Sequence, residues 1–501
     1  MTASDARLRR NAWLVVGGLV VLRLVAAALT PLTFDEAYYW TWSRHLAGGY
    51  YDHPPMVAVV IRLGTMLGGD TEFGVRVVSI LLGLPMTWAV YETAALLFGG
   101  QRIAATSAIL LNVTLMVAVG TMIVTPDAPL MVATSFVLYG LAKVATTGRG
   151  AWWLAVGVAV GVALLSKYTA LFFGVVILLW LVLVPTQRRW LLTPWPYLGG
   201  AIAFLVFVPV IVWNADHQWV SFLKQFGRAR IDHMTLRYIG EIIPTQLLFA
   251  TPSIFALGAM GLYALGRRGN GALASRALIA LFVWVIVAYF AWHSLHSRVE
   301  ANWFAPVYPA FAIAAAAAAC MVPWRPRTQA FAASSLRWAG PVGIVMFVLL
   351  VVQANTGILT GYRRDVSVRS VGVGWRDLAA QIEAVRARTG ATCVLAADYG
   401  TTGWLAFYLP KGTCVAEYFE RIRWINMPEP SPRQLAGKML FVSDVNARYS
   451  ELRQAFARIE EVGQVQRKRG PLVIKTYRLD LLDGAKGDAL DRSPPRELAP
   501  R

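Results

Sequence analysis

The chain has 501 residues, of which 57% are hydrophobic and only 15% are charged, and its formal net charge is +19. A chain this apolar could not be kept soluble as an ordinary globular protein. The composition therefore predicts a protein embedded in a membrane. The positive charge could suggest a nucleic-acid partner, but the basic residues are scattered between apolar segments and form no stripe with stacking aromatics, which argues against that class.

Apolar segments recur from the N-terminus to about residue 354, and hydropathy predicts about eleven transmembrane helices. The clearest segments are residues 11–29, 104–124, 171–184 and 198–213, with a last span near residues 340–354. Arg7, Arg9 and Arg10 precede the first segment and indicate a cytoplasmic N-terminus. The length of that segment and Arg23 within it favour an uncleaved anchor over a cleaved signal peptide. Arg23 is costly in hydrocarbon, so we expect it to face the bundle interior or a water-filled cavity.

Alternate loops then fall on opposite sides of the membrane. The cytoplasmic set is rich in Lys and Arg and almost free of acid: Arg102 and residues 143–149, 188–189, 267–276 and 325–337. The opposite set mixes both charge signs with histidine: residues 35–76, 125–127, 166–168, 216–241 and 293–302. The positive-inside rule is satisfied, and the reactive side chains share one face. We therefore expect a multi-pass membrane protein whose reactive residues lie on the side opposite the cytoplasm.

The composition changes to that of a soluble domain after the last span. Short strand-like runs at residues 392–397, 414–416, 439–442 and 472–477 alternate with a helical pattern at residues 375–388. We predict a transmembrane domain over residues 1–356, a small periplasmic α/β domain over residues 357–483 and a disordered tail over residues 484–501. Cys393 and Cys414 each begin a strand-like run, and the sequence leaves open whether they form a disulfide or stay two free thiols.

The first outer loop carries two groups of polar side chains. Asp35 and Glu36 follow the first span directly, where adjacent carboxylates are costly unless they are solvated or used. They either stabilise a helix N-terminus or serve as a base or clamp for an acceptor hydroxyl. Further along, Asp52 and His53 precede two prolines, whose fixed backbone can hold the imidazole in one direction.

The later outer loops add one carboxylate and several cations. Asp127 stands between Pro126 and Pro129, as a helix cap, a site carboxylate or both. Lys167 either snorkels or binds phosphate. The third and fourth loops contain the further polar residues Lys224, Arg228, Arg230, His233, Arg237, His293, His296, Arg298, Glu300 and Asn302. Cations outside the cytoplasm oppose the topological bias, so they indicate either an anionic lipid substrate or contact with ordinary anionic lipids.

These motifs, taken in order, resemble those of a known family. The Asp35-Glu36 pair, the turn of Asp52 and His53, Asp127 and the stretch from Glu300 through Asn302 are similar to the bacterial protein-mannosyltransferase-like family of the GT-C superfamily, which includes the aminoarabinose transferases acting on lipid A. The sequences Gly374-Trp375 and Phe407-Tyr408-Leu409-Pro410 look like the outer soluble domain of that family, so the resemblance covers roughly the whole chain.

The resemblance implies a polytopic GT-C fold and a polyprenyl-phosphate-linked monosaccharide as donor. The resemblance also implies a bacterial inner membrane, with the active site on the periplasmic face. Transfer to a lipid, polysaccharide or protein acceptor would take place on that face, with inversion at the anomeric carbon. Asp35 corresponds to the first-loop catalytic carboxylate and Asp127 to the second acidic residue, with Glu36 as the third catalytic candidate. His53 stands where the aminoarabinose transferases carry Lys, so phosphate binding through it could be weaker or sensitive to pH.

The substrate-binding candidates are then Asp52, His53, Lys167, Arg228, Arg230, Arg298, Glu300 and Asn302. The sequence shows no set of residues at metal-ligand spacing and requires no cofactor, although carboxylates near a phosphate could recruit a divalent cation. Two alternatives stay open: a transporter or flippase of a lipid-linked sugar, and a ligase of a lipid-linked glycan. A transporter should show paired, interrupted helices from inverted repeats, and the sequence shows no such pairing.

Overall fold

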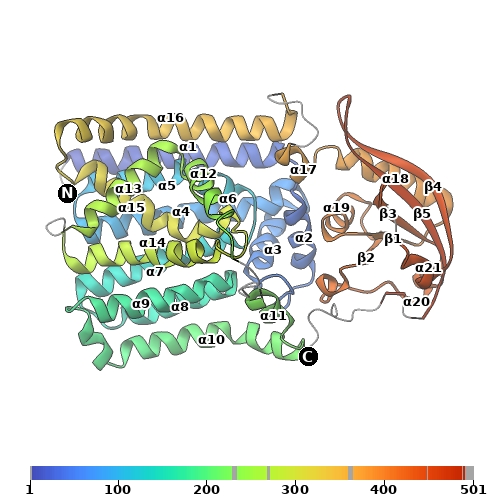
Figure 1. The fold of residues 1–501 in the computed structure, drawn as a ribbon, viewed down its shortest axis with the longest axis horizontal. Helices are drawn as coiled ribbons and strands as arrows, with labels where there is room; N and C mark the ends of the chain where they lie inside the picture. Colours follow the sequence, from blue (N-terminus) through green and yellow to red (C-terminus); the bar gives the residue numbers. More distant parts are fainter. Residues whose placement is uncertain are drawn as a thin grey trace.

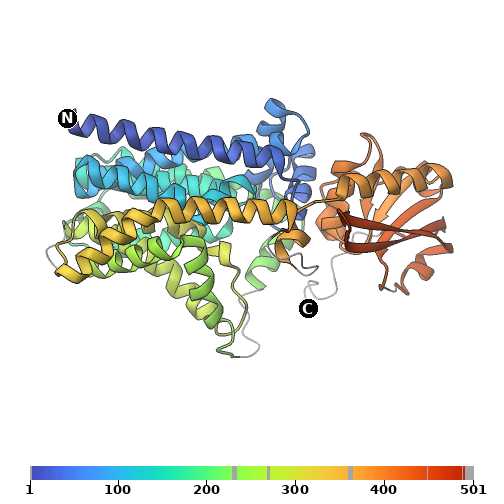
Figure 2. The same cartoon turned by 90° about the horizontal axis from the view of Figure 1, so that it is seen from above.

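The computed structural model describes residues 3–227, 234–267, 271–358, 365–447, 449–487 and 489–490. A helical bundle forms one end of an elongated molecule and a small sheet domain forms the other, with short helices between them (Figure 1). The N-terminus lies at the end of the bundle far from the sheet domain, and the view from above shows the same separation (Figure 2).

Within the described chain, seven helical segments are long and apolar enough to cross a membrane. They are α1 (Ala3–Leu29), α4 (Glu72–Phe98), α7 (Asp127–Thr147), α10 (Trp195–Asp216), α14 (Leu273–His293), η3 with α15 (Ala301–Cys320) and α16 (Pro326–Thr356). Two bent pairs raise the number to nine: α5 (Gln101–Val113) with α6 (Leu115–Met122), and α12 (Ile239–Ala250) with α13 (Pro252–Gly266). The described chain therefore has seven to nine such spans, compared with about eleven predicted. Three further apolar helices are shorter, among them α8 (Trp152–Ser166) and α9 (Leu171–Leu183), which pack within the bundle. The chain is a multi-pass membrane protein.

Two details of the bundle differ from the sequence prediction. The span predicted over residues 104–124 is bent by 59°, because Thr114 leaves the helical conformation and its side chain caps α6 by accepting from the amide of Val117. The basic segment 325–337 is not a loop. It forms the first turns of α16, where Pro326 supplies a backbone angle that suits a helix start.

Arg23 of α1 is buried inside the bundle, as expected for a cation in a membrane span. Its Nη2 atom donates to the backbone oxygen of Asn112 at 2.6 Å and to the Oδ1 atom of Asn112 at 3.1 Å. The Nδ2 atom of Asn112 in turn donates to Thr87, so three helices share one polar network. Such a network satisfies polar groups that lipid could not solvate.

Three short helices cover the end of the bundle that faces the sheet domain: α2 (Phe34–Arg44), α3 (Met56–Gly68) and α11 (Val220–Gly227) (Figure 1). The loops that charge bias placed on one face do meet here, since the structure pairs Glu36 with Val124, Asp127 with Lys167, and Asp52 with Lys224. Residues about 40 to 170 positions apart in sequence thus assemble into one region.

The C-terminal domain contains a five-stranded sheet in the order β2-β1-β3-β5-β4. Its strands are β1 (Cys393–Ala396), β2 (Cys414–Glu417), β3 (Met439–Asp444), β4 (Phe456–Arg469) and β5 (Leu472–Ala485). Its helices are α17 (Val366–Ser370), α18 (Trp375–Thr389), α19 (Tyr399–Tyr408), η4 (Arg421–Trp424), α20 (Pro432–Leu435) and α21 (Leu452–Ala455). Strand β1 pairs in parallel with β2 and β3, whereas β5 is antiparallel to both β3 and β4.

A shared hydrophobic core joins this domain to the bundle. Tyr38 and Trp42 of α2 belong to the same buried cluster as Trp375 and Trp404, whose rings stack 4.8 Å apart. Helix α19 lies so close to α2 that a Cβ atom at Gly403 would come within 2.7 Å of the amide nitrogen of Tyr38. The close contact therefore depends on glycine at this position.

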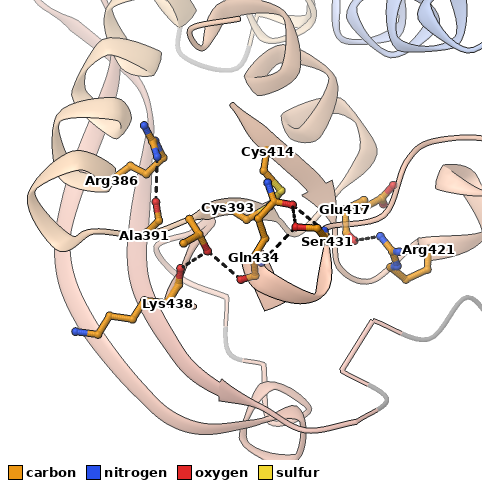
Figure 3. The surroundings of a disulfide bond; sticks show 10 residues. Arg386, Ala391, Cys393, Cys414, Glu417, Arg421, Ser431, Gln434 and Lys438 are labelled. Carbon is orange, nitrogen blue, oxygen red and sulfur yellow. Dashed lines mark hydrogen bonds between the residues drawn. A yellow bond between two sulfur atoms is a disulfide. The ribbon is translucent and has the colours of Figure 1, made fainter. Parts of the chain in front are cut away.

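A disulfide joins Cys393 and Cys414, which answers the question that the sequence left open (Figure 3). The two residues face each other at the start of the parallel strands β1 and β2. The bond therefore ties the edge strand of the sheet to its neighbour. Cys320, in the bundle, is a free thiol.

Replacing both Cys393 and Cys414 with Ser is expected to lower the free energy of unfolding of the C-terminal domain by about 3 kcal/mol, because the bond closes a loop of about 20 residues in the unfolded chain. Thermal unfolding of the purified protein, followed by fluorescence, measures the change. Cys320→Ser is the matched control, and equal stability of the double variant and this control would contradict the prediction.

Candidate active site

The start of helix α2 sends its two carboxylates in different directions. Thr33 caps the helix by accepting from the amide of Glu36, and the Glu36 carboxylate accepts from the amide of Thr33 in return. This capping box fixes the first turn. Glu36 then lies inside the protein, whereas Asp35 lies toward the C-terminal domain, where the hydroxyl of Tyr399 donates to its Oδ1 atom at 3.3 Å.

Glu36 has no free oxygen for a substrate. Arg76 donates to both of its oxygens, at 2.7 and 2.6 Å, and the amide of Val124 donates to Oε1 at 3.1 Å. Both side chains of the Glu36–Arg76 pair are fully buried, at 0% exposure. Glu36 therefore connects α2 to the segment before Asp127, and we assign it a positioning role in place of the catalytic role expected from the sequence.

Glu36→Gln is expected to lower the free energy of unfolding by about 3–5 kcal/mol, because it leaves the guanidinium of Arg76 buried without a counter-charge. Thermal unfolding in detergent measures the loss. Glu72→Gln is the control, since its partner Arg376 is 77% exposed and such pairs contribute about 1 kcal/mol or less. A Glu36→Gln variant as stable as this control would exclude the positioning role.

Asp35 has the electrostatic properties of a base. Burial raises its pKa from 3.8 to about 7, although the hydrogen bond from Tyr399 and the charge of Arg423 act in the opposite direction. A carboxylate with a pKa near neutrality can take up a proton during a reaction and release it afterwards. The separation of roles between Asp35 and Glu36 follows from their surroundings, since the two are neighbours in sequence.

Tyr39 of α2 is a further buried residue of this region. Burial raises the pKa of its phenol well above the ordinary value, and the charges of Asp35, Asp52 and Asp127 raise it further. Tyr39 lies four residues after Asp35 in α2, hence on the same side of the helix. It was not among the predicted site residues, although that spacing could have identified it.

Asp127 is held by two side chains from distant segments. The Nζ atom of Lys167 donates to Oδ1 at 2.7 Å, and the Nδ2 atom of Asn302 donates to Oδ2 at 2.6 Å. All three had been selected from the sequence, and the structure brings them together. Because Lys167 is bound in this way, its ammonium is fixed in position, and two of its three donors remain for other partners.

A cavity of about 290 Å³ lies beside this group and is lined by both Lys167 and His53. The rest of its wall is mainly aromatic and aliphatic: Tyr168, Thr169, Leu171, Phe172, Gln225, Phe226, Tyr289, Phe290, His293 and Trp303. An apolar cavity with an ammonium and an imidazole in its wall suits an anionic group carried on an apolar chain.

Asp52 binds cations of the protein itself. Its Oδ1 atom accepts from Lys224 and, at 2.6 Å, from Arg423, while Tyr38 donates to Oδ2 at 2.9 Å. Burial alone would raise its pKa, but the charges of Lys224 and Arg423 outweigh burial and hold the pKa well below its usual range. Asp52 thus joins the first outer loop to α11 and to the C-terminal domain.

Arg423 and Tyr399 also belong to the site, and neither was predicted from the sequence. Both come from the C-terminal domain, and the guanidinium of Arg423 lies 4.4 Å from the centre of the Tyr399 ring. Through these contacts the domain reaches Asp35 and Asp52 directly. The sequence offered no signal for either residue, because their roles depend on how the domain docks.

Comparisons with known proteins bear on the fold of the chain. The family model described as dolichyl-phosphate-mannose-protein mannosyltransferase matches residues 52–213. The structure of ArnT from Cupriavidus metallidurans bound to undecaprenyl phosphate superposes with a TM-score of 0.63 at 17% identity, covering 96% of this chain and 99% of that chain. The chain has the GT-C fold.

Two further proteins show how far the similarity of this GT-C chain extends. The lipid A galacturonosyltransferase RgtD of Rhizobium johnstonii is 30% identical over 217 residues, which are 42% of this chain and 44% of that protein. The match therefore spans less than half of the relative. The arabinofuranosyltransferase AftD from Mycobacteria has a TM-score of 0.52 at 14% identity, covering 95% of this chain and 40% of that chain.

Not all predicted residues join the site of this GT-C protein. Arg298 is 64% exposed and pairs with Glu241 at 3.0 Å, and Glu300 is also exposed. Neither lines the cavity of Lys167 and His53. Arg298 instead makes an ordinary surface ion pair. Arg228 and Arg230 lie outside the described residues.

The sequence left open whether carboxylates at the site bind a divalent cation. Among the residues that the structure describes, no group of three or more His, Cys, Asp or Glu side chains is arranged to hold a metal ion. The cations seen at the site are side chains: Lys167 beside Asp127, and Lys224 and Arg423 beside Asp52.

Proposed function

We propose that the chain is a glycosyltransferase that moves a monosaccharide from a polyprenyl-phosphate-linked donor to an acceptor hydroxyl on the periplasmic face, with inversion. The proposal rests on two observations: α2 carries Asp35, a base with a pKa near 7, and Tyr39 of the same helix lies beside His53, which lines an apolar cavity together with Lys167. The ring centre of Tyr39 lies 6.3 Å from that of His53, and the charge of Asp35 contributes to the raised pKa of the Tyr39 phenol.

The similar proteins support the same substrate classes. The ArnT structure contains undecaprenyl phosphate, a polyprenyl phosphate, and the name of RgtD assigns lipid A as its acceptor. We extend these classes to the present chain as a lipid-phosphate donor and a lipid or glycan acceptor. The residues that line the cavity determine which sugar is transferred, and neither similar protein identifies that sugar for this chain.

The reaction would take place in a single displacement. Asp35 takes the proton of the acceptor hydroxyl, and the oxygen attacks the anomeric carbon. The bond between that carbon and the phosphate oxygen breaks, and the electron pair leaves with the polyprenyl phosphate. Attack from the side opposite the leaving group inverts the anomeric carbon.

Lys167 and His53 would stabilise the departing phosphate. A fixed cation lowers the barrier most when it is already in place, so the salt bridge that holds Lys167 on Asp127 is part of the mechanism. Asn302 donates to the other oxygen of the Asp127 carboxylate and so helps to fix its orientation. Asp127 therefore acts through Lys167 and is assigned a positioning role.

The test is turnover of a defined donor by the purified protein in detergent micelles, where no membrane separates two compartments. Polyprenyl-phosphate-linked galacturonic acid and aminoarabinose serve as the probes, with lipid A as the acceptor and mass spectrometry as the detection. Appearance of a glycosylated acceptor together with free polyprenyl phosphate is the expected result. Binding of both donors without release of either sugar would favour a transporter and overturn the proposal.

A further inference from the structure

A second, larger cavity of about 790 Å³ lies in the C-terminal domain, against the start of α2. It opens at the ends of two parallel strands: β1, followed by Asp398, and β3, which ends at Asp444. Open α/β sheets bind ligands beyond the carboxyl ends of their parallel strands. The volume lies within the range of about 300–1,000 Å³ that is usual for small-molecule sites. We call this space the domain cavity.

The domain cavity shares a wall with the candidate active site. The ring of Tyr399 lines the cavity, and its hydroxyl donates to Asp35 at 3.3 Å. Phe34, the residue before Asp35, also lines the cavity, with its ring centre 6.0 Å from those of Tyr399 and Trp404. A molecule in the domain cavity therefore lies one side chain away from the base.

The polar groups of the cavity leave no strong excess of either charge. The two carboxylate oxygens of Asp398 accept hydrogen bonds from the amide and the hydroxyl of Thr401, each at 2.8 Å. Asp444 lies 3.4 Å from Lys475, and Arg467 donates to the backbone oxygens of residues 368, 371 and 373. The wall carries three cations, Arg369, Arg467 and Lys475, and two carboxylates, Asp398 and Asp444, and most of these groups already hold hydrogen bonds or an ion pair. It therefore offers mixed hydrogen-bond donors and acceptors and carries little net charge.

This chemistry suits a saccharide. Sugar hydroxyls need both donors and acceptors, which Asn446, Thr476 and Lys475 supply, and the C–H faces of a sugar ring pack on aromatic rings such as Tyr399. An aromatic and polar wall of this kind would hold a lipid chain poorly, since a chain has no groups to satisfy the polar atoms.

We propose that the domain cavity binds the glycan part of the acceptor at a distance from the hydroxyl that receives the sugar. This inference rests on the proposed function and narrows it, because it requires an acceptor that carries a saccharide. The C-terminal domain then does more than cover the site: it selects the acceptor, while the bundle holds the donor.

The first test measures binding without turnover, by saturation-transfer NMR on the purified full-length protein. The probes are the deacylated glucosamine disaccharide of lipid A, the same disaccharide without its phosphates, and inorganic phosphate. We expect both disaccharides to bind. Asn446 and Arg369 both line the domain cavity, and Asn446→Ala and Arg369→Ala should each weaken binding about tenfold, the size of one lost hydrogen bond. Arg388→Ala, an exposed arginine of α18 away from the cavity, is the matched control and should leave binding unchanged.

The outcomes separate this inference from the proposed function. Binding of inorganic phosphate as strong as that of the disaccharides, or binding that both cavity variants leave intact, would overturn the domain cavity as a glycan site even if transfer is observed. In the transfer assay, the cavity variants should raise the KM for the acceptor about tenfold and leave the KM for the donor unchanged. A rise in the donor KM would also overturn the inference. Loss of sugar transfer altogether concerns the proposed function and does not affect the binding result.

Discussion

Asp35→Asn is expected to reduce sugar transfer by about 10²–10⁴-fold, the contribution typical of a general base, while lipid-phosphate binding stays at the wild-type level. The amide has the shape of the carboxylate and can still accept from Tyr399, but it cannot take the proton of the acceptor hydroxyl. The measurement is kcat/KM with a labelled donor, together with binding of polyprenyl phosphate. An Asp35→Asn variant that retains full transfer activity would exclude the base role.

The pH dependence of transfer provides a second measurement on the same residue. The pKa of Asp35 is raised to about 7, so the basic form accumulates as the pH rises through 7. We expect kcat/KM to increase tenfold per pH unit below that value and to level off above it.

A stability measurement shows whether the Asp35→Asn variant is folded. The folded protein holds the Asp35 proton more tightly than the unfolded chain, whose pKa is near 3.8. Stability therefore falls as the pH rises from 3.8 to about 7 and then stays at the lower level. Because Asn does not ionise, the variant should melt at a higher temperature than the wild type at pH 8 and at the same temperature below pH 4. A variant that melts at a lower temperature at pH 8 would show that loss of activity reflects misfolding.

The sequence was informative wherever local chemistry determines the outcome. Asp35 and Asp127 each follow an apolar span and lie at a helix start, and charge bias alone placed their loops on one face. The meeting of Asp127, Lys167 and Asn302 confirms that these loops converge. What the sequence could not separate is Asp35 from Glu36, since their different roles come from Arg76 and Tyr399, 40 and 364 residues away.

The fold shows the same division. Four of the five strands were predicted, but β4 was missed because only Phe456, Val465 and Arg467 of its 14 residues are buried. A strand so exposed lacks the alternation of apolar and polar residues that identifies strands in sequence. Arg298 was predicted to bind substrate because its sequence neighbours do not reveal its ion-pair partner. That partner, Glu241, lies 57 residues away in the chain.

The C-terminal domain has an active part in the site, which the sequence did not indicate. Arg423 connects Asp52 to the ring of Tyr399, and Tyr399 connects to Asp35. The donor side, with Lys167 and His53, belongs to the bundle alone. Any movement of the domain would therefore alter the surroundings of the base and the acceptor side before it altered the donor side.

Asp52→Asn is expected to weaken this connection and to lower both stability and transfer. The side chains of Asp52, Lys224 and Arg423 are only 9%, 11% and 18% exposed, so the substitution leaves two largely buried cations without their shared counter-charge. Breaking a buried pair costs about 3–5 kcal/mol, and Glu420, which stays 3.0 Å from Arg423, places the expected loss near the lower end. Thermal unfolding and limited proteolysis that releases the C-terminal domain measure the effect.

Asp70→Asn is the matched control, because Asp70 belongs to the same outer segment and pairs with Arg44 at 3.1 Å, but both side chains are about one quarter exposed. Its loss should cost about 1 kcal/mol or less. The pH dependence should differ as well: Asp52 has a lowered pKa, so its stabilising effect is present above pH 3.8 and is lost as the pH falls below that value. If Asp52→Asn and Arg423→Gln each reduced stability but the double variant showed their full sum, the two residues would act independently, and the connection between domain and bundle would have to lie in the shared hydrophobic core instead.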